Sequence, residues 1–527
     1  MLKKKYSILL VSPEMMIPEL GSAACNANFR GGLGILAGDI MEGLAKQGIN
    51  ATAIVPFNDR DWKTRGKINY DKIKTLPVAN LEIKIRNREK QILHVRKVKR
   101  AGFDVYGLCS ANIYDILYTG DKWQRFRQEI LLGHSVPALL RILGMKPDII
   151  WLQEGHTALV AAITKDNSDF SGAKHLFTNH TLSPGGLETY PIDSFSFDEL
   201  GVDYKYYNIF VKDGLLNMSR GGMILADWIT TVSLEHARLA KNGIFREFAH
   251  KITGIRNGSS RKIGISPRIK ALEKRGGITA LKLWEAHLAD KRNFLEHIGQ
   301  TTDRTLNPEK LIVGWVRRLD RYKNQWPMLA PIARAICAKR GEWVNTPFGA
   351  LEGLDIQLFG AGRAHENDNY CLGWIGEFAN LCSNGLMSKA IFLPSYSLEL
   401  RRNAAMACDI WLSCPWPGWE ACGTSDQIAV FNGNINIASC TGGPAEYIEE
   451  YNPVTTEGNG CFIEPYEPMT VYLKLKMLSD LYYMYLERGD ERWLKLRQAS
   501  YEVGKKLDVA LMIEKYEEIF EKILCQT

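Results

Sequence analysis

Short apolar runs alternate with amphipathic stretches along most of the chain, which is the pattern of a parallel sheet covered by helices. The runs are strand-length and fall into two series, separated by a charged stretch and a polar segment at 299–308. This pattern predicts an α/β protein with two doubly wound, Rossmann-like halves. The predicted strands are 6–11, 50–55, 148–152, 175–178 and 228–232 in the first series, and 311–316, 356–359, 390–394, 410–413 and 435–438 in the second.

Helical periodicity fills the segments between these strands. It predicts a helix at 40–47, a charged helical stretch at 266–298 and a helical tail at 469–524. The last part of this tail, at about 510–524, is expected to pack back on the first half. The predicted domains are therefore an N-terminal domain at 1–262, a helical connector at 263–308, a C-terminal domain at 309–505 and a C-terminal helix at 506–527.

Length and composition agree with two folded domains. A chain of 527 residues is too long for one core, and 46% hydrophobic with 24% charged residues is ordinary for a globular protein. The densest basic stretch, 63–100, contains Leu81, Ile83 and Ile85 alternating with Glu82, Lys84 and Arg86, which predicts a half-buried strand. The formal net charge of +7 is mild for this length and argues against a nucleic-acid partner.

The number of cysteines and the hydropathy of the chain indicate in which cellular compartment the protein is expected. Eleven cysteines, an odd number without a C-x-x-C pair, fit neither a disulfide framework nor a zinc site. The sequence contains no apolar run of about 18 residues, so a membrane span is not expected. We therefore predict a cytoplasmic protein without a metal.

Two glycine-rich segments follow predicted strands and precede helices. Gly31, Gly32, Leu33 and Gly34 form the first, and Thr441, Gly442 and Gly443 form the second. Free N–H groups at such a position can bind an anion. The alternatives are a plain tight turn for the first segment and an N-cap made by Thr441 for the second.

Charged and polar side chains follow other strands of the two series. Arg318 and Lys323 come directly after the strand at 311–316, where cations can clamp a phosphate. Glu420 lies in a segment with Gly423 and Thr424 and can accept hydrogen bonds from sugar hydroxyls. His156 and His180 each follow a strand end, and either one is equally well explained as a structural loop histidine.

These segments resemble two related families of retaining glycosyltransferases, the α-glucan phosphorylases and the bacterial-type glycogen or starch synthases. The resemblance implies the GT-B fold, in which two Rossmann-like domains face an interdomain cleft. The matching segments are the G-G-L-G loop at 31–34, H-T-A-L-V at 156–160, F-T-N-H-T at 177–181, N-M-S-R at 217–220, R-L-D-R-Y-K at 318–323, G-R-A-H at 362–365, E-A-C-G-T-S at 420–425 and T-G-G at 441–443.

The chain departs from each family at one important position. Phosphorylases carry a lysine that binds pyridoxal phosphate, and this chain has Ile428 there, which forms no imine. Synthases place a lysine just before the glycine loop, where this chain has Phe29 and Arg30. The stretch at 21–28 also lengthens that loop. We therefore expect no cofactor.

The preferred hypothesis is transfer of glucose from a nucleotide-diphosphate sugar to the non-reducing end of an α-1,4-glucan. The resemblance implies His156 near the reacting sugar, Asn257 at its 6-hydroxyl and Glu420 at its 3- and 4-hydroxyls. The two halves are then expected to close around the donor. Two alternatives stay open: a phosphorylase that works without pyridoxal phosphate, and an inactive glycan-binding regulatory homologue.

Overall fold

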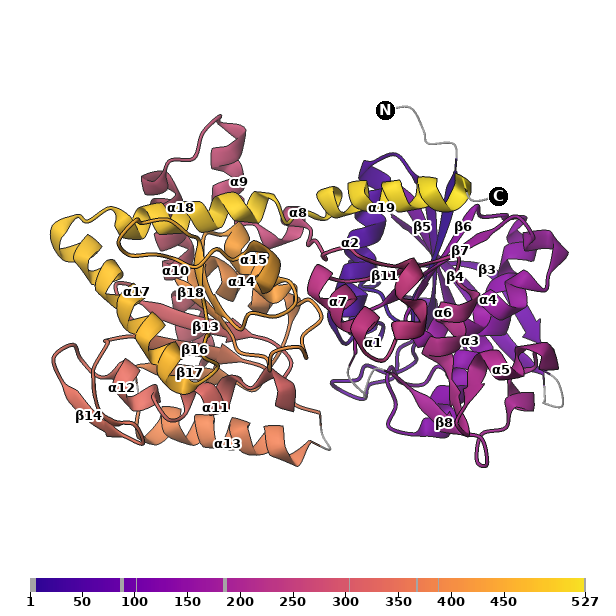
Figure 1. The fold of residues 1–527 in the computed structure, drawn as a ribbon, viewed down its shortest axis with the longest axis horizontal. Coiled ribbons are helices and arrows are strands. Elements are labelled where there is room, and N and C mark those ends of the chain that lie inside the picture. Colours follow the sequence, from indigo (N-terminus) through magenta and orange to yellow (C-terminus); the bar gives the residue numbers. More distant parts are fainter. Residues whose placement is uncertain are drawn as a thin grey trace. The chain divides into compact units, whose positions relative to one another are not determined.

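The computed structural model describes residues 6–85, 90–100, 102–182, 187–302, 304–365, 368–386 and 388–525. The chain forms two compact units (Figure 1). Residues 1–257 and 509–527 make the first unit, and residues 258–508 make the second. The segment at 263–308, expected to be a separate connector, is part of the second unit because its helices pack into that unit's core.

The first unit is built on a nine-stranded sheet in the order β12-β11-β7-β6-β1-β2-β5-β4-β3. All neighbours from β12 to β5 are parallel, and β4 and β3 extend the sheet as an antiparallel hairpin. The strands are β1 (Ser7–Val11), β2 (Asn50–Phe57), β3 (Leu76–Ile83), β4 (Gln91–Arg100), β5 (Phe103–Cys109), β6 (Ile149–Gln153), β7 (Lys174–Asn179), β11 (Trp228–Thr231) and β12 (Ile252–Gly254), and a separate small sheet holds β8 (Thr189–Pro191), β9 (Val211–Lys212) and β10 (Leu215–Asn217).

The five strands predicted for this unit are confirmed as β1, β2, β6, β7 and β11. The alternation predicted in the basic stretch is also confirmed, since Leu81, Ile83 and Ile85 are buried while Glu82 and Lys84 are exposed. Arg86 lies outside the described residues. Lys84 therefore lies on the solvent face of a hairpin, whereas Arg96 and Arg100 of the same region are largely buried in ion pairs.

Helices cover both faces of this sheet (Figure 1). The helix predicted at 40–47 begins earlier, at Gly32, because the glycine loop itself forms the first turn. The stretch at 21–28, expected to lengthen the loop, instead forms a short helix whose Ala24, Cys25 and Ala27 are buried. The helices are α1 (Ser22–Ala27), α2 (Gly32–Lys46), α3 (Lys122–Leu143), α4 (Ala158–Lys165), α5 (Tyr207–Phe210), α6 (Met218–Leu225), α7 (Leu234–Asn242) and α19 (Val509–Cys525).

The last of these helices, α19, joins the first unit although the chain has passed through the second unit before reaching it. Ile513 packs against Gly43 of α2, where a Cβ would lie 2.6 Å from the isoleucine side chain. Tyr516 and Phe520 pack on Trp151 of β6, with ring centroids 4.4 and 5.5 Å from the indole. The helix therefore completes the core of the first unit.

The second unit contains a six-stranded parallel sheet in the order β17-β16-β13-β18-β19-β20. All five predicted strands are confirmed, as β13, β16, β17, β18 and β19. The edge strand β20 and an exposed two-stranded hairpin were not predicted. The strands are β13 (Ile312–Val316), β14 (Trp343–Thr346), β15 (Gly349–Glu352), β16 (Gln357–Ala361), β17 (Ala390–Leu393), β18 (Ile410–Ser413), β19 (Ile435–Ala438) and β20 (Gly460–Phe462).

Two long helical predictions are divided in the structure. The stretch at 266–298 forms α9 and α10, which are separated near Gly276 with its φ of +88°. The tail at 469–524 forms α17, α18 and α19, and Gly489 ends α17 with a φ of +72°. The helices of the second unit are α8 (Arg261–Gly264), α9 (Pro267–Lys274), α10 (Ala280–Thr302), α11 (Gln325–Leu329), α12 (Ala333–Cys337), α13 (Asn369–Asn384), α14 (Leu398–Ala407), α15 (Ser425–Phe431), α16 (Pro444–Tyr447), α17 (Pro468–Arg488) and α18 (Arg492–Lys505).

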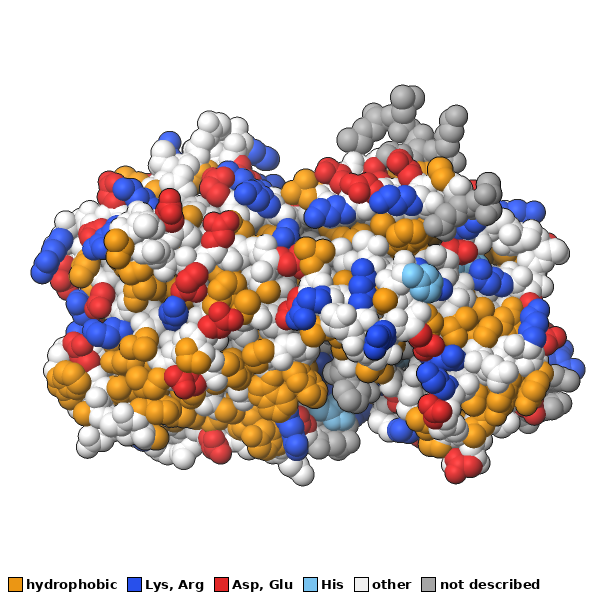
Figure 2. Space-filling view, in the orientation of Figure 1, with side chains coloured by type: hydrophobic (Ala, Val, Ile, Leu, Met, Phe, Trp, Pro, Cys, Tyr) orange, Lys and Arg blue, Asp and Glu red, His pale blue; other side chains and the backbone are white. Residues whose placement is uncertain are grey.

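The surface charge, the cysteines and the lengths of the helices bear on the sequence-based expectations about partners, membrane and metal. On the face drawn in Figure 2, side chains of both charges are interspersed over each unit. All eleven cysteines, each within the described ranges, are free thiols. Among the described residues no helix is long and apolar enough to cross a bilayer. In the same part of the chain, no three His, Cys, Asp or Glu side chains gather in a way that would hold a metal ion.

Candidate active site

The candidate residues of the second unit lie at the carboxyl ends of three adjacent strands. Arg318 and Lys323 follow β13, Glu420 follows β18, and Thr441 to Gly443 follow β19. Because these strands are parallel neighbours, their carboxyl ends meet at one edge of the sheet. Three segments that are far apart in the sequence therefore lie close together in the second unit.

A buried ion cluster surrounds Glu420. Arg317 Nη2 lies 2.6 Å from Glu420 Oε2, and Lys323 Nζ contacts the same oxygen. Arg317 also donates through Nη1 to the Ser413 hydroxyl at 2.8 Å, which ties it to the end of β18. The side chains of Arg317, Lys323 and Glu420 are only 7%, 11% and 11% exposed. The carboxylate is thus held from one side by two cations.

This cluster shifts the pKa of its members. Burial, together with repulsion from Arg317, lowers the pKa of Lys323 to about 8, against the attraction of Glu420. Burial alone would raise the pKa of Glu420, but Lys323 and Arg317 outweigh it and hold that pKa below its usual value. At neutral pH, Glu420 is therefore ionised and Lys323 is mostly charged.

Arg318 takes a different position from Arg317. Its side chain is 53% exposed, and its Nη2 lies 3.5 Å from the Asp320 carboxylate. The two neighbouring arginines therefore differ in position. Arg317 is buried against Glu420, and Arg318 lies at the surface of the same strand end. The sequence interpretation chose Arg318 and did not identify Arg317.

The Thr441–Gly443 turn packs directly on the segment that carries Glu420. A side chain at Gly442, whose φ is +58°, would clash with the Glu420 carbonyl, and one at Gly443 would lie 2.8 Å from Cys422 Sγ. Thr441 Oγ1 accepts from the Gly418 N–H at 2.9 Å and makes no helix cap, so the N-cap alternative is wrong. The helix that follows, α16, is a single turn.

The remaining residues of the glycine- and hydroxyl-rich segment lead into α15. Thr424 precedes the helix and its hydroxyl lies 3.4 Å from Arg401 Nη1. A side chain at Gly423 would lie 2.8 Å from the Asp426 carboxylate, so only glycine fits there. Ile428 is 5% exposed and packs in an apolar cluster with Phe431. The position that carries the pyridoxal-binding lysine in phosphorylases is therefore core packing in this chain.

In the first unit, the glycine loop is already bonded to an internal anion. The Glu14 carboxylate, at the end of β1 and 1% exposed, accepts from the N–H groups of Arg30 at 2.5 Å and Gly31 at 3.1 Å. Burial raises its pKa, while these amides and that of Gly34 oppose the shift. Around Gly32, by contrast, a side chain would meet no described atom within 4 Å. Gly32 is thus the open part of the loop.

Tyr118 links this loop to the predicted histidine. Its hydroxyl bonds to the Glu14 carboxylate, and its carbonyl accepts from Arg30 Nη1 at 3.4 Å. The tyrosine ring lies edge-on to His156 at 5.6 Å and under the Arg125 guanidinium, also at 5.6 Å. Tyr118 holds a φ of +53°, which is uncommon for a bulky residue and shows that its surroundings fix it.

The protonation of His156 follows from its partner. Arg125 Nη2 lies 2.6 Å from His156 Nε2, and since a guanidinium only donates, Nε2 accepts and the proton sits on Nδ1. Burial and the Arg125 charge lower the pKa of His156 well below its usual value, so the ring is neutral. In the described part of the chain Nδ1 has no hydrogen-bond partner. The histidine therefore offers one oriented N–H donor.

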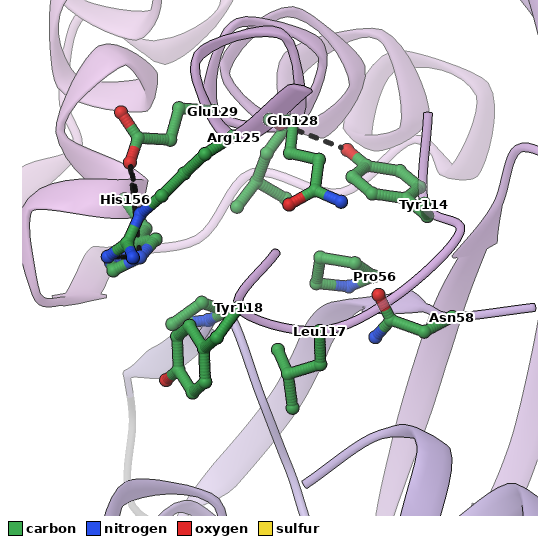
Figure 3. Close-up of a pocket in the computed structure, with 11 residues that line it drawn as sticks. Pro56, Asn58, Tyr114, Leu117, Tyr118, Arg125, Gln128, Glu129 and His156 are labelled. Carbon is green, nitrogen blue, oxygen red and sulfur yellow. Dashed lines mark hydrogen bonds and ion pairs between the residues drawn. The ribbon is translucent and has the colours of Figure 1, made fainter. Parts of the chain in front are cut away.

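Figure 3 shows these side chains at a small pocket at the strand ends. Arg125 lies 2.8 Å from Glu188 and 3.7 Å from Glu129, whose pKa is raised by burial to about 8. At neutral pH, Glu129 is therefore mostly protonated beside Arg125. The pocket is lined by Pro13, Pro56, Asn58, Tyr114, Leu117, Tyr118, Arg125, Gln128, Glu129, Leu132 and His156.

His180 and Asn257 occupy other strand ends of the same sheet. His180 donates through Nε2 to Gln153 Oε1 at 2.8 Å, and its backbone N–H donates to Glu154 Oε1 at 2.7 Å. Burial lowers its pKa to about 3. Asn257 is 5% exposed and its N–H donates to the Val232 carbonyl at 3.0 Å. Both residues are held at the same edge of the sheet as His156.

The chain resembles known proteins over most of its length. Residues 8–250 match the family model of the starch synthase catalytic domain. The maltodextrin phosphorylase of Thermococcus litoralis is 27% identical, with 93% of this chain and 68% of that protein aligned. The glycogen synthase of Fervidobacterium nodosum is 25% identical, with 87% and 90% aligned.

A solved structure agrees with these relatives in fold. The catalytic domain of starch synthase IV from Arabidopsis thaliana, bound to ADP and acarbose, matches with a TM-score of 0.78 over 99% of both chains at 18% identity. The parallel sheets, the clusters at the strand ends and the aligned relatives all indicate the same fold and the same class of enzyme. The chain is a glycosyltransferase of the GT-B fold, similar to glycogen and starch synthases and to α-glucan phosphorylases.

Proposed function

We propose that this chain transfers glucose from a nucleotide-diphosphate sugar to the non-reducing end of an α-1,4-glucan, with retention of the anomeric configuration. The observation that carries the proposal is the buried cluster of Glu420 with Lys323 and Arg317. A carboxylate held ionised beside two cations can bind sugar hydroxyls next to an anionic leaving group. The synthase relatives, and the ADP bound in the starch synthase structure, support this choice of donor.

The charge of this cluster favours a phosphorylated ligand. Arg317 and Lys323 contribute two positive charges against one carboxylate, and Arg318 stands half exposed beside them. Burial strengthens the attraction for an anion because the surrounding protein screens charge less than water does. Lys323 and Arg318 therefore stabilise the charge that develops on the departing diphosphate.

In this proposal Arg317 orients Glu420. Both cations contact Oε2 of the carboxylate, so Oε1 accepts hydrogen bonds from the 3- and 4-hydroxyls of the glucose ring. The Thr441–Gly443 turn holds the Glu420 backbone in place. No enzyme nucleophile is needed if the acceptor hydroxyl attacks on the face from which the diphosphate leaves.

The first unit supplies neutral hydrogen-bonding groups. His156 donates its Nδ1 proton to a sugar oxygen, and Arg125 fixes the ring orientation. His180 and Asn257 stand at neighbouring strand ends, where the resemblance places groups for the sugar's hydroxyls. We further propose that no pyridoxal phosphate takes part, since Ile428 has no amine, and that the reaction takes place in the cytoplasm.

The experiment that tests the function compares two incubations of the purified chain with maltoheptaose. One receives ADP-glucose or UDP-glucose, and the other receives inorganic phosphate. Chain lengthening with release of nucleoside diphosphate supports the proposal. Glucose 1-phosphate in the second incubation alone identifies a phosphorylase, and binding of maltoheptaose without either product identifies an inactive glycan-binding homologue.

A further inference from the structure

Two tryptophans in the segment that leads from β18 to Glu420 are exposed. Trp416 is 36% exposed and Trp419 is 46% exposed, whereas Trp411 and Leu412 of β18 are buried. Large aromatic side chains are normally well covered in a folded protein. Trp416 and Trp419 lie within four residues of each other and together form an exposed apolar surface, which is typical of a binding site.

The two rings form a corner. Their centroids lie 5.5 Å apart and their planes meet at 83°. Two perpendicular rings cannot sandwich a flat nucleobase between parallel faces. A pyranose ring is thicker than a base, with C–H groups on its faces and hydroxyls at its edge, so it fits an aromatic corner with a polar group at its rim.

The backbone under the two rings is fixed. Trp416 N–H donates to the Tyr322 carbonyl at 2.7 Å, and Trp419 N–H donates to the Trp416 carbonyl at 3.0 Å. The N–H of Gly418, a residue with a φ of +82°, donates to Thr441 Oγ1 at 2.9 Å. The turn is thus bonded to the segments that follow β13 and β19, and the Cα positions of the two tryptophans are fixed.

The geometry points to Trp416 and Trp419 as a stacking subsite for the apolar face of a glucopyranose ring. Trp419 directly precedes Glu420, so one ring can rest on indole while its hydroxyls reach the carboxylate. The ring belongs either to the donor glucose or to the terminal residue of the glucan. This inference rests on the proposed function, because it takes the ligand of Glu420 to be glucose.

The test measures binding by calorimetry to the full chain and to Trp416→Ala and Trp419→Ala. The ligands are maltoheptaose alone, ADP-glucose alone and ADP alone. Trp343→Ala is the matched control, since Trp343 is 70% exposed but lies on the β14–β15 hairpin. Trp419→Phe keeps an aromatic face, and thermal melting checks that each variant folds.

We expect each alanine variant to bind a sugar ligand about tenfold more weakly or worse, with Trp419→Phe and Trp343→Ala close to wild type. A loss confined to maltoheptaose assigns the corner to the glucan, and a loss for ADP-glucose but not ADP assigns it to the donor sugar. Unchanged affinities overturn the inference, as does an equal loss for ADP, which would mean base stacking.

Failure of the proposed function gives a different result. If the wild-type chain transfers no glucose and binds no ADP-glucose, but binds maltoheptaose in a tryptophan-dependent way, the function is wrong and the subsite stands. If the chain lengthens maltoheptaose and the alanine variants bind both sugar ligands normally, the function stands and the subsite is wrong. A wild-type chain that binds neither sugar ligand overturns the subsite as well.

Discussion

The two units carry buried clusters of different composition, one based on α3 in the first unit and one at strand ends in the second. In the first unit one cation, Arg125, lies near the carboxyl groups of Glu188 and of Glu129, which is mostly protonated at neutral pH. In the second unit one carboxylate, Glu420, lies beside the cations of Arg317 and Lys323. The first cluster therefore holds more acceptor oxygens, and the second holds more cationic donors.

The largest effect is expected where one of the cations that follow β13, Lys323 of the second cluster or the exposed Arg318, is lost. Lys323→Ala and Arg318→Ala should each lower turnover about 100-fold or more, because a preorganised charge is removed from the leaving group. The measurement is the initial rate of nucleoside diphosphate release. Arg292→Ala, which removes an exposed arginine paired with Glu309 in the same unit, is the control and should change little. Normal rates in both active-site variants would mean that the diphosphate is bound elsewhere.

The dependence of the reaction rate on pH tests whether Lys323 must be charged for activity. Burial lowers its pKa to about 8, so the side chain is charged below this pH and becomes neutral above it. We expect kcat/KM for the donor to fall as pH rises through about 8, approaching tenfold per pH unit. Rates measured from pH 6 to 9.5 test this. Lys323→Arg should remove the fall, and a variant with the wild-type profile would assign the fall to another group.

Glu14 allows a test of the internal anion in the first unit. Glu14→Gln keeps the shape but weakens the bonds to the N–H groups of Arg30 and Gly31, so the free energy of unfolding should drop by about 1–3 kcal/mol. Urea denaturation followed by circular dichroism measures the change. Gln47→Ala, which removes an exposed contact to Glu514 in the same unit, provides the comparison and should be near neutral. Equal stability of all three proteins would show that Glu14 does not hold the loop.

The smallest expected effect concerns pyridoxal phosphate. Because Ile428 packs in the core and has no amine, the purified chain should show no absorbance band of an internal aldimine. Adding pyridoxal phosphate should leave the rate with either donor unchanged. A band that borohydride abolishes would contradict this expectation and would reopen phosphorolysis through that cofactor.

The sequence predicted most of the fold because the central strands are buried on both faces and read as continuous apolar runs. It missed β20 and β12, which are only three residues long, and the β14–β15 hairpin, in which exposed Trp343 breaks the expected burial pattern. It also missed β5 in the first unit, although that strand is seven residues long and mostly buried. It merged α9 with α10 because local periodicity carries no information about a turn that tertiary packing creates near Gly276.

The sequence predicted which segments form the candidate site, but it did not predict the contacts between their side chains. Motif positions after strands placed Lys323 and Glu420 correctly at one sheet edge, but only the folded chain shows that they bond to each other. Glu14 and Arg125 were missed because their partners lie 16 and 31 residues away, at Arg30 and His156. The available signal was the spacing of four residues between Arg125 and Glu129 on α3, which places them on one face of the helix.

The position of α19 has a consequence for the order in which the protein folds during synthesis. The first unit needs residues 509–525, which the ribosome makes about 250 residues after β12 is complete. Until then, Gly43 and Trp151 lack their partners on α19 and leave apolar surface uncovered. The unit that emerges first is therefore finished last, and a chain interrupted within the second unit presents that surface to chaperones or to other nascent chains.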